Sequence, residues 1–370
     1  MVRVLHIVGT MNCGGTQNML MNIYRKIDRS KVQFDFLINA KEKCFFEDEI
    51  TEMGGKLYRI KKWKPSNTLS YIKDLDAFFT EHKEYQVLQS HIASSSAINL
   101  KLAKRHGLYA IAHSHSTKGE CNSLKDLPVK LGSFPIRFCA DHFFACSKKA
   151  GEVRFGKKIT KSEKFDLLPN ALDIDKYKTT TKSYEEIQKQ YDLKDKFVVG
   201  HIGRFYAVKN HMFLLSVFEE ILKLKDNSVL VLVGGGGEIY EPLVERIKNT
   251  GLEDKVIFTG VTPDVSRYLQ VMNCFVFPSL SEGLGIVAIE AQCFGLPCFI
   301  NETLPPELYI NHNVYGISLK KSPEEWAKMI LEKSNTKICE EAAKENVKKA
   351  GYDINETVRM LEEFYSTHSK

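Results

Sequence analysis

The sequence contains no apolar run that could cross a bilayer, because none reaches the roughly 18 residues that a membrane-spanning helix needs. Its start, MVRVLHIVGT, holds one arginine and a short apolar run. A longer hydrophobic segment followed by a small-residue cleavage site is lacking. We therefore expect neither a transmembrane helix nor a signal peptide, and we expect a cytoplasmic protein.

Two common cofactor signatures are also missing. The nine cysteines are odd in number and contain no C-x-x-C pair, and Cys293 and Cys298 stand too isolated for a zinc site. The glycine run at 234–237 has no dinucleotide fingerprint around it, which argues against a dehydrogenase. We expect reduced, mostly buried thiols.

Positive charge is concentrated in the first half of the chain. Residues 1–170 carry 28 Lys and Arg against 17 Asp and Glu, whereas the remainder carries 24 against 29. The basic residues are dispersed, without a recognition-helix pattern or an aromatic RNA-binding motif, so we expect no nucleic acid partner. An anionic membrane surface or a phosphate-bearing acceptor suits this half, and a solvated basic surface is the alternative.

Short apolar runs alternate with amphipathic stretches, a pattern typical of doubly wound parallel sheets. The pattern lapses near 170–195 and then restarts, so we predict two Rossmann-like α/β domains with a ligand cleft between them. The main predicted strands are 2–9, 32–39, 85–91, 109–115, 141–147, 196–205, 228–238, 255–260 and 274–279, and the predicted helices include 17–26 and 211–225.

The loop after the strand at 196–205 carries two cations, Arg204 and Lys209. In open parallel sheets, ligands lie beyond the carboxyl ends of the strands. An arginine fork and a lysine point charge at such an end suit a diphosphate, and a solvated surface pair is the alternative. Gly14 and Gly15, between the first strand and the first helix, form a weaker candidate for anion binding.

Two glutamates bracket the stretch LSEGLGIVAIEAQ. Glu282 lies in a predicted loop with Gly283 and Gly285, which let the backbone approach a ligand. The amides near Ile286 and Val287 begin the next helix and would face a phosphate or sugar hydroxyls. Glu290 is expected about two turns along that helix, so the two carboxylates would grip opposite ends of one elongated, hydroxyl-bearing ligand.

Taken together, these motifs resemble a known family. GRFYAVKN, then PSLSEGLGIVAIEAQCFGLP, look like the retaining nucleotide-sugar glycosyltransferases of family 4, which have the GT-B fold. MNCGGTQNML, LPNALDIDKY and the final YDINETVRMLEEFY are similar to that family too. The resemblance implies an acceptor domain at 1–172, completed by a crossover helix at 351–370, and a nucleotide-sugar domain at 173–350.

The resemblance also implies roles for the matching residues. Arg204 and Lys209 would bind the donor diphosphate, Glu282 the transferred sugar and Glu290 the nucleotide ribose. Gly15 would lie near the β-phosphate. The remaining implied donor contacts are backbone or apolar positions in the loops that follow the strands: Gly14, Gly236, Val261, Gly283, Gly285, Ile286 and Val287.

Histidines gather where two predicted strands end. In IAHSHST, His115 is the better register match to the family histidine that contacts the donor sugar, although Ser116 follows it where the family usually has Asp or Gly. His113 remains the alternative for that role. His91, after YQVLQS, is a third candidate.

Metal ligation is not expected. Asp74 and Asp76, and likewise Asp173 and Asp175, spell D-x-D, but neither pair follows a strand into a nucleotide pocket. We predict no cofactor and no metal, since Arg204 and Lys209 can neutralise a leaving diphosphate.

The sequence therefore predicts a retaining, metal-independent glycosyltransferase that uses a nucleotide-diphosphate sugar, with a UDP-sugar preferred. The acceptor would be a saccharide, lipid-linked, in exopolysaccharide or capsule biosynthesis, with peripheral contact at the inner membrane face. The alternatives are an epimerase or phosphorylase of the same fold, or a non-catalytic sugar-nucleotide-binding subunit. The segment 123–144, with apolar residues among lysines and arginines, is a further candidate for an acceptor flap or interfacial surface.

Overall fold

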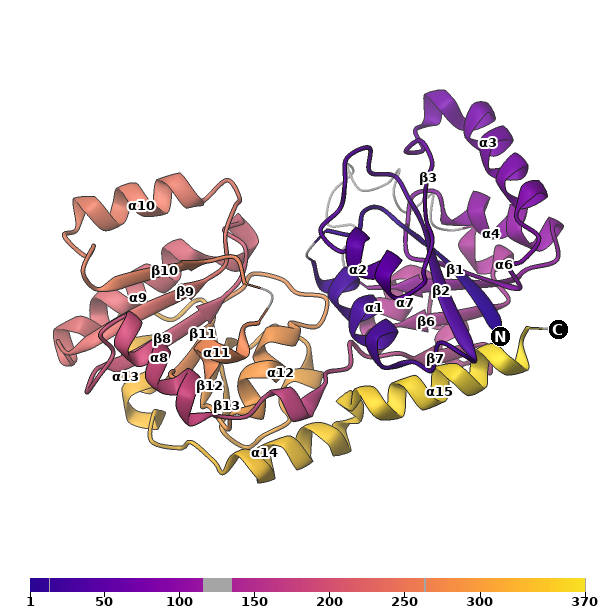
Figure 1. Ribbon diagram of the computed structural model, residues 1–370. Helices are drawn as coiled ribbons and strands as arrows, with labels where there is room; N and C mark the ends of the chain where they lie inside the picture. The colour runs from indigo at the N-terminus through magenta and orange to yellow at the C-terminus, as the bar shows by residue number, and fades with distance from the viewer. Residues whose placement is uncertain (13, 116–134, 263, 370) are drawn as a thin grey trace. The chain divides into compact units, whose positions relative to one another are not determined.

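The computed structural model describes residues 1–12, 14–115, 135–262 and 264–369. The chain divides into two compact units, one formed by residues 1–172 with 353–370 and the other by residues 173–352. Each unit is a parallel sheet with helices packed on it (Figure 1). Most of the predicted flap at 123–144 lies outside the described residues, and its remainder forms a short helix and a strand.

The first unit, here the N-terminal unit, has a seven-stranded sheet in the described residues, in the order β3-β2-β1-β4-β5-β6-β7. All of its pairings are parallel, with Val4 opposite both Phe34 and Val87. The strands are β1 (Val2–Val8), β2 (Val32–Ile38), β3 (Leu57–Arg59), β4 (Val87–Ser90), β5 (Tyr109–Ser114), β6 (His142–Ala145) and β7 (Phe165–Leu167).

Helices connect these strands as right-handed parallel crossovers require. The helices are α1 (Gly15–Lys26), α2 (Glu47–Glu52), α3 (Thr68–Glu81), α4 (Ser96–Arg105), α6 (Ile136–Cys139), α7 (Lys148–Phe155) and α15 (Ile354–Thr367), with 3-10 turns at Pro65–Asn67 and Ile159–Lys161.

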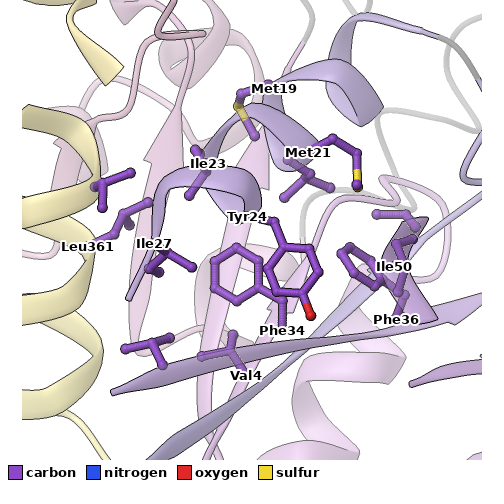
Figure 2. Packing of buried hydrophobic residues seen from close by; sticks show 14 of the residues in the cluster. Val4, Met19, Met21, Ile23, Tyr24, Ile27, Phe34, Phe36, Ile50 and Leu361 are labelled. Carbon is purple, nitrogen blue, oxygen red and sulfur yellow. The ribbon is translucent and has the colours of Figure 1, made fainter. Parts of the chain in front are cut away.

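The core of this unit is aromatic. Figure 2 shows Tyr24 of α1 beside Phe34 and Phe36 of β2, and the ring centroids of Tyr24 and Phe34 are 5.5 Å apart. All three side chains are fully buried. Burying one such side chain stabilises a fold by roughly 1.5–3 kcal/mol, so this cluster fixes α1 on the sheet.

The last helix, α15, belongs to the N-terminal unit. Its Leu361 packs near Ile23 and Ile27 of α1 (Figure 2). The backbone nitrogen of Ile354 donates to the oxygen of Leu172, and the Asp353 side chain accepts from the nitrogen of Asn355 at the start of the helix. The apolar stripe of α15 thus closes a core that the first 172 residues leave open.

The second unit, here the C-terminal unit, has a six-stranded parallel sheet in the order β10-β9-β8-β11-β12-β13 within the described residues. Its strands are β8 (Phe197–Ile202), β9 (Ser228–Val233), β10 (Val256–Gly260), β11 (Cys274–Phe277), β12 (Cys298–Asn301) and β13 (Val314–Ile317). Its helices are α8 (Thr181–Gln190), α9 (His211–Leu224), α10 (Tyr240–Asn249), α11 (Ser266–Leu269), α12 (Ile286–Cys293), α13 (Pro323–Lys333) and α14 (Glu340–Val347). Shorter turns lie at Ile174–Lys176, Ala207–Lys209, Pro306–Leu308 and Lys348–Tyr352.

Each sheet has one point where the strand order reverses. In the N-terminal unit the reversal lies between β1 and β4, and in the C-terminal unit it lies between β8 and β11. Crossovers leave in opposite directions there, so the loops part and open a crevice at the carboxyl ends of the strands. The predicted fold class, two Rossmann-like parallel-sheet units, is confirmed.

No helix in the described part of the chain combines the length and the apolar character that a membrane crossing demands. The cysteines that the structure describes are all free thiols, and most of them are buried.

Candidate functional site

Arg204 and Lys209 lie in the loop that follows β8, at the reversal point of the C-terminal sheet. Arg204 is exposed, and its guanidinium carbon lies 4.9 Å above the Tyr206 ring. Lys209 is mostly covered, and its Nζ lies 4.9 Å from the centre of the Phe277 ring. Both rings hold a cation by its attraction to the π face.

The loop after β11 brings Glu282 to Lys209. Lys209 Nζ lies 2.7 Å from Glu282 Oε1, and both side chains are less than one-fifth exposed. Backbone contacts fix the two loops together, because the nitrogen of Leu280 donates to the oxygen of Val208 at 2.8 Å. The structure therefore places two of the predicted site residues in direct contact.

Helix α12 begins beside this ion pair. Gly285 precedes it with φ of 85°, a left-handed conformation that favours glycine, and a Cβ there would lie 3.0 Å from the Phe277 ring. No side chain caps the helix start in the described structure, so the N–H groups of Ile286 and Val287 can donate hydrogen bonds to a ligand. Gly283 lies between Glu282 and this turn.

Glu290 is the fifth residue of α12, which puts it about one turn into the helix. The predicted two turns are too many, because the four residue steps from Ile286 to Glu290 span only about one turn at roughly 3.6 residues per turn. Tyr177 Oη donates to Glu290 Oε1 at 2.9 Å, and Glu290 Oε2 is buried without a hydrogen-bond partner among the described residues. Burial raises the pKa of the Glu290 carboxyl to about 7.

Tyr177 was not among the predicted site residues. It lies in LPNALDIDKY, a motif that had no assigned role beyond connecting the domains. Burial, and then the charge of Glu290, raises the pKa of its hydroxyl well above the usual value, so Tyr177 acts as a hydrogen-bond donor. The sequence signal that could have identified Tyr177 was an aromatic residue at the edge of a polar linker.

The glycine run after β9 has a structural reason that sequence did not supply. At Gly234 and Gly237 a Cβ would lie 2.1 Å from the oxygen of Gly203 and 2.3 Å from that of Phe205, respectively. The run therefore packs against the loop of Arg204. Gly236, with φ of 62°, has open space at its Cβ position, and Val261 after β10 is 68% exposed.

In the N-terminal unit, Gly14 and Gly15 begin α1 at the other reversal point. Gly14 is the residue before the helix and caps it through its backbone alone, and Gly15 has no atom within 4 Å of its Cβ position. No acidic residue occupies the first turn. The free amides at this helix start give a partial positive charge with room above it.

Three histidines at the carboxyl ends of β4 and β5 meet a fourth, His6, from within β1. His91 Nδ1 lies 2.7 Å from His115 Nε2, and His91 Nε2 lies 3.1 Å from His6 Nδ1. The rings of His113 and His115 are 3.9 Å apart at their centroids. All three predicted histidines are thus together, and His6, which sequence reasoning missed, joins them from the interior of an apolar strand.

Burial keeps these imidazoles neutral. It lowers the pKa of His6 and His115 to about 3 and that of His91 and His113 well below the usual value, because the charged form loses its hydration. His113 Nδ1 lies 2.9 Å from Gln89 Nε2, and Gln89 Oε1 accepts from Tyr365 Oη at 2.6 Å. The histidine cluster is therefore anchored to α15.

The D-x-D pairs serve as ordinary charge partners. Asp76 Oδ1 in α3 lies 2.8 Å from His106 Nε2, and Asp175 Oδ1 lies 3.6 Å from Lys348 Nζ. Asp173 Oδ2 lies 3.5 Å from Lys176 Nζ. As expected, neither pair follows a strand.

The two reversal-point sites on parallel sheets define a protein of the GT-B class, and comparison with known proteins gives its family. Residues 183–350 match the model of the glycosyl transferases group 1. Over 98% of its length the chain is 30% identical to EpsF of Bacillus subtilis, which bears a glycosyltransferase name, and it spans 96% of that protein. The chain belongs to the group 1 glycosyltransferase family.

Two further relatives span the whole chain. The capsular polysaccharide biosynthesis glycosyltransferase CapH of Staphylococcus aureus is 25% identical, with 99% of each chain covered. The crystal structure of Anabaena Alr3699/HepE in complex with UDP-glucose superimposes with a TM-score of 0.80 at 18% identity, covering 99% of this chain and 100% of the other. The latter likeness is one of fold.

Proposed function

We propose that this glycosyltransferase transfers a sugar, with retention of anomeric configuration, from a nucleotide-diphosphate sugar to a saccharide acceptor in cell-surface polysaccharide biosynthesis. The observation that carries the proposal is the Lys209–Glu282 pair at the uncapped start of α12. A cation, a carboxylate and free amides in one place suit a ligand that joins a diphosphate to a hydroxyl-rich sugar. The likeness to the UDP-glucose complex of HepE supports a UDP-sugar as donor.

Each end of the donor would have its own partner. Arg204, Lys209 and the amides of Ile286 and Val287 would bind the diphosphate, and Glu282 would accept hydrogen bonds from the transferred sugar. Glu290 has one buried oxygen without a hydrogen-bond partner among the described residues, which suits a ribose hydroxyl. Gly236 and Val261 would border the nucleotide, and Gly283 and Gly285 would admit the sugar.

The ion pair makes donor binding an exchange reaction. Without a donor, Glu282 neutralises Lys209 at 2.7 Å. A diphosphate would attract the Lys209 ammonium, and the Glu282 carboxylate would then be released for the sugar hydroxyls. Breaking a half-buried pair without replacement is costly, so binding both ends of the donor at once is favoured over binding either end alone.

The proposed chemistry needs no protein nucleophile. The bond between the sugar C1 and the diphosphate oxygen breaks, and an acceptor oxygen bonds to C1 from the same face. The acceptor proton passes to the departing phosphate, whose charge Arg204, Lys209 and the helix amides stabilise. The reaction is proposed to be independent of metal, and His115, or His113, would contact the donor sugar from the N-terminal unit with Gly14 and Gly15 near its phosphates.

A lipid-linked acceptor and a peripheral position at the inner face of the cell membrane complete the proposal. They rest on the basic surplus of residues 1–170. Sedimentation with liposomes tests the membrane contact. Equal binding to anionic and neutral vesicles would contradict it.

The central experiment combines a thermal-shift screen with a turnover assay. Nucleotide diphosphates and their sugars are screened first, and the donor should give the largest shift, because a ligand that binds only the folded state stabilises it by RT ln(1 + [L]/Kd). Release of free nucleotide diphosphate is then measured with and without saccharide acceptors. We expect release only when an acceptor is present.

Other outcomes identify the rival activities. Conversion of the donor to its isomer without acceptor would indicate an epimerase, and dependence on inorganic phosphate would indicate a phosphorylase. Tight donor binding with no turnover on any acceptor tried, together with unchanged polysaccharide production by a Glu282→Gln strain, would indicate a binding subunit.

A further inference from the structure

Three imidazoles of the N-terminal unit bring ring nitrogens close together. His91, His113 and His115 each provide one ring nitrogen, and the three nitrogens all lie within 4.8 Å of one another. The residues come from the ends of β4 and β5, which are neighbouring parallel strands. Among the residues that the structure describes, no other group of three His, Cys, Asp or Glu side chains is placed in this way.

We propose that His91, His113 and His115 form a binding site for a divalent transition-metal cation of the zinc class, with a fourth coordination position open. The donor-sugar contact proposed above uses one member of this cluster, His115 or His113, whereas the metal proposal rests on the geometry of all three histidines and does not depend on the transfer reaction. An all-imidazole donor set suits Zn²⁺, Co²⁺, Ni²⁺ or Cu²⁺ and does not suit Mg²⁺ or Ca²⁺, which prefer oxygen ligands.

Two of the nitrogens need a partner. His113 Nε2 and His115 Nδ1 are buried, and the described residues give neither of them a hydrogen bond. The His113 side chain belongs to a residue that is only 5% exposed. A buried polar atom without a partner costs free energy, and a bound cation would supply the missing contact to His113 Nε2, whereas His115 turns its other nitrogen, Nε2, toward His91.

Outer partners hold two of the rings as they do in metal sites. His91 Nε2 lies 3.1 Å from His6 Nδ1, so an N–H on His91 Nε2 that donates to His6 leaves the lone pair on Nδ1 facing the cluster. His113 Nδ1 lies 2.9 Å from the Gln89 amide. A half-turn of that amide lets Gln89 Oε1 accept from His113 Nδ1–H while Tyr365 Oη accepts from Gln89 Nε2, which frees the lone pair of His113 Nε2.

A small rearrangement would complete the site. Zinc–nitrogen bonds of roughly 2.0–2.1 Å place tetrahedral ligands about 3.3 Å apart, so the rings need to shift by an ångström or so. His91 and His115 follow their strands and are only partly buried, which permits that movement. Without metal, the hydrogen bond of 2.7 Å between His91 and His115 keeps the rings gathered.

Cobalt titration of the full-length, chelator-stripped protein tests the proposal. Co²⁺ bound by three imidazoles and a water has intense visible absorption, and Zn²⁺ should abolish it by displacement. We expect one equivalent per chain. His91→Gln and His115→Gln should each weaken Co²⁺ binding by more than the roughly 10–100-fold that loss of an outer partner costs, and Gln89→Leu should fall in that 10–100-fold range.

The controls separate this site from other causes. His312→Gln removes an exposed histidine of the C-terminal unit and should leave the titration unchanged. Circular dichroism of each variant without metal checks its folding. If the variants do not fold, X-ray absorption of the zinc-loaded wild type gives the number of imidazole ligands, and three are expected.

Several results would overturn the site. These are the absence of stoichiometric Co²⁺ binding by the wild type, equal losses in His115→Gln and His312→Gln, or an X-ray absorption spectrum without imidazole ligands. Failure here would leave the thermal shifts produced by donor nucleotides untouched. Failure of the transferase proposal would in turn leave the cobalt spectrum unchanged.

Discussion

The two units place very different side chains at the same topological position. At the reversal point of the C-terminal sheet, an exposed arginine, a lysine–glutamate pair and the glycines of the Glu282 loop follow β8 and β11. At the reversal point of the N-terminal sheet, four neutral histidines gather, three at the ends of β4 and β5 and His6 within β1. One crevice is built from fixed charges, and the other from buried groups that can donate, accept or ligate.

This difference shows how two units of the same fold can suit different kinds of ligand. Fixed charges and helix amides suit a diphosphate, whose charge is permanent. Neutral imidazoles suit hydroxyls or a soft cation, because their lone pairs are directional and carry no net charge. The sheets supply the same crevice in both units, and only the residues at the strand ends determine the chemistry.

The largest effect is expected from removing the charge in the C-terminal unit. Lys209→Met should lower kcat/KM for the donor by roughly 10²–10³-fold, because it deletes a donor aimed at the leaving diphosphate. Initial-rate kinetics measure it. Lys321→Met, which breaks an exposed pair with Glu325 at 2.9 Å, is the matched control and should change little. If the Lys209→Met enzyme has normal kinetics, the proposal that this loop binds the diphosphate is wrong.

The next effect concerns pH. The folded-state pKa of Glu290 is raised from 4.5 to about 7, so the folded protein holds a proton that the unfolded chain has released. The wild type should therefore lose stability relative to Glu290→Gln as pH rises from 4.5 to about 7, by roughly 1–3 kcal/mol in total. Urea unfolding at several pH values measures this difference.

The ionisation of Glu290 should also change the KM for the donor. If ionised Glu290 accepts ribose hydroxyls, donor KM should fall as pH rises from 6 to 8, and Glu290→Gln should flatten that profile. Glu345→Gln, on an exposed helical pair, is the control that should keep the wild-type profile. If the difference in unfolding free energy between the wild type and Glu290→Gln stays constant from pH 4.5 to about 7, Glu290 does not titrate in that range.

A smaller effect is expected from Tyr177→Phe. The change removes the hydrogen bond of 2.9 Å to Glu290 and leaves both carboxylate oxygens without a described partner. We expect donor KM to rise about tenfold with kcat nearly unchanged, because Tyr177 positions the carboxylate and does not touch the reacting atoms. Tyr315→Phe, which loses a hydrogen bond to Thr336, should leave KM alone. A fall in kcat as large as the rise in KM would argue for a wider structural role of Tyr177.

The smallest effect is expected in the N-terminal unit. Tyr365→Phe should destabilise the protein by about 1 kcal/mol, since Gln89 Oε1 then loses its donor inside the core. Chemical unfolding measures it, with the partly exposed Tyr109→Phe as control. No change would mean that a water replaces the hydroxyl.

Sequence reasoning reached the fold through periodicity and strand-end logic. The strand predicted at 228–238, which was expected to end in glycines, ends earlier, at Val233, and the predicted helix 17–26 begins two residues earlier, at Gly15. The nearness of Lys209 and Glu282 follows from the rule that loops beyond neighbouring parallel strands meet. Their roles toward a donor stay predictions.

Other features depend on long-range contacts that no local pattern reports. Tyr177 meets Glu290 across 113 residues, and Tyr365 meets Gln89 across 276. His6 sits in an apolar strand, and its partner His91 becomes visible only when β1 pairs with β4. The glycine run after β9 suggested a ligand, whereas its close contacts are with the backbone of a neighbouring loop.

The contribution of α15 to the N-terminal core has a consequence for synthesis. A ribosome makes the strands of this unit before the C-terminal unit, but Val358, Leu361 and Tyr365, which finish its core, are made after the C-terminal unit. The first-made half must wait in an incomplete state, with aromatic surface uncovered, while the whole second half emerges and folds. The core of the N-terminal unit can therefore be completed only after the C-terminal unit has been translated.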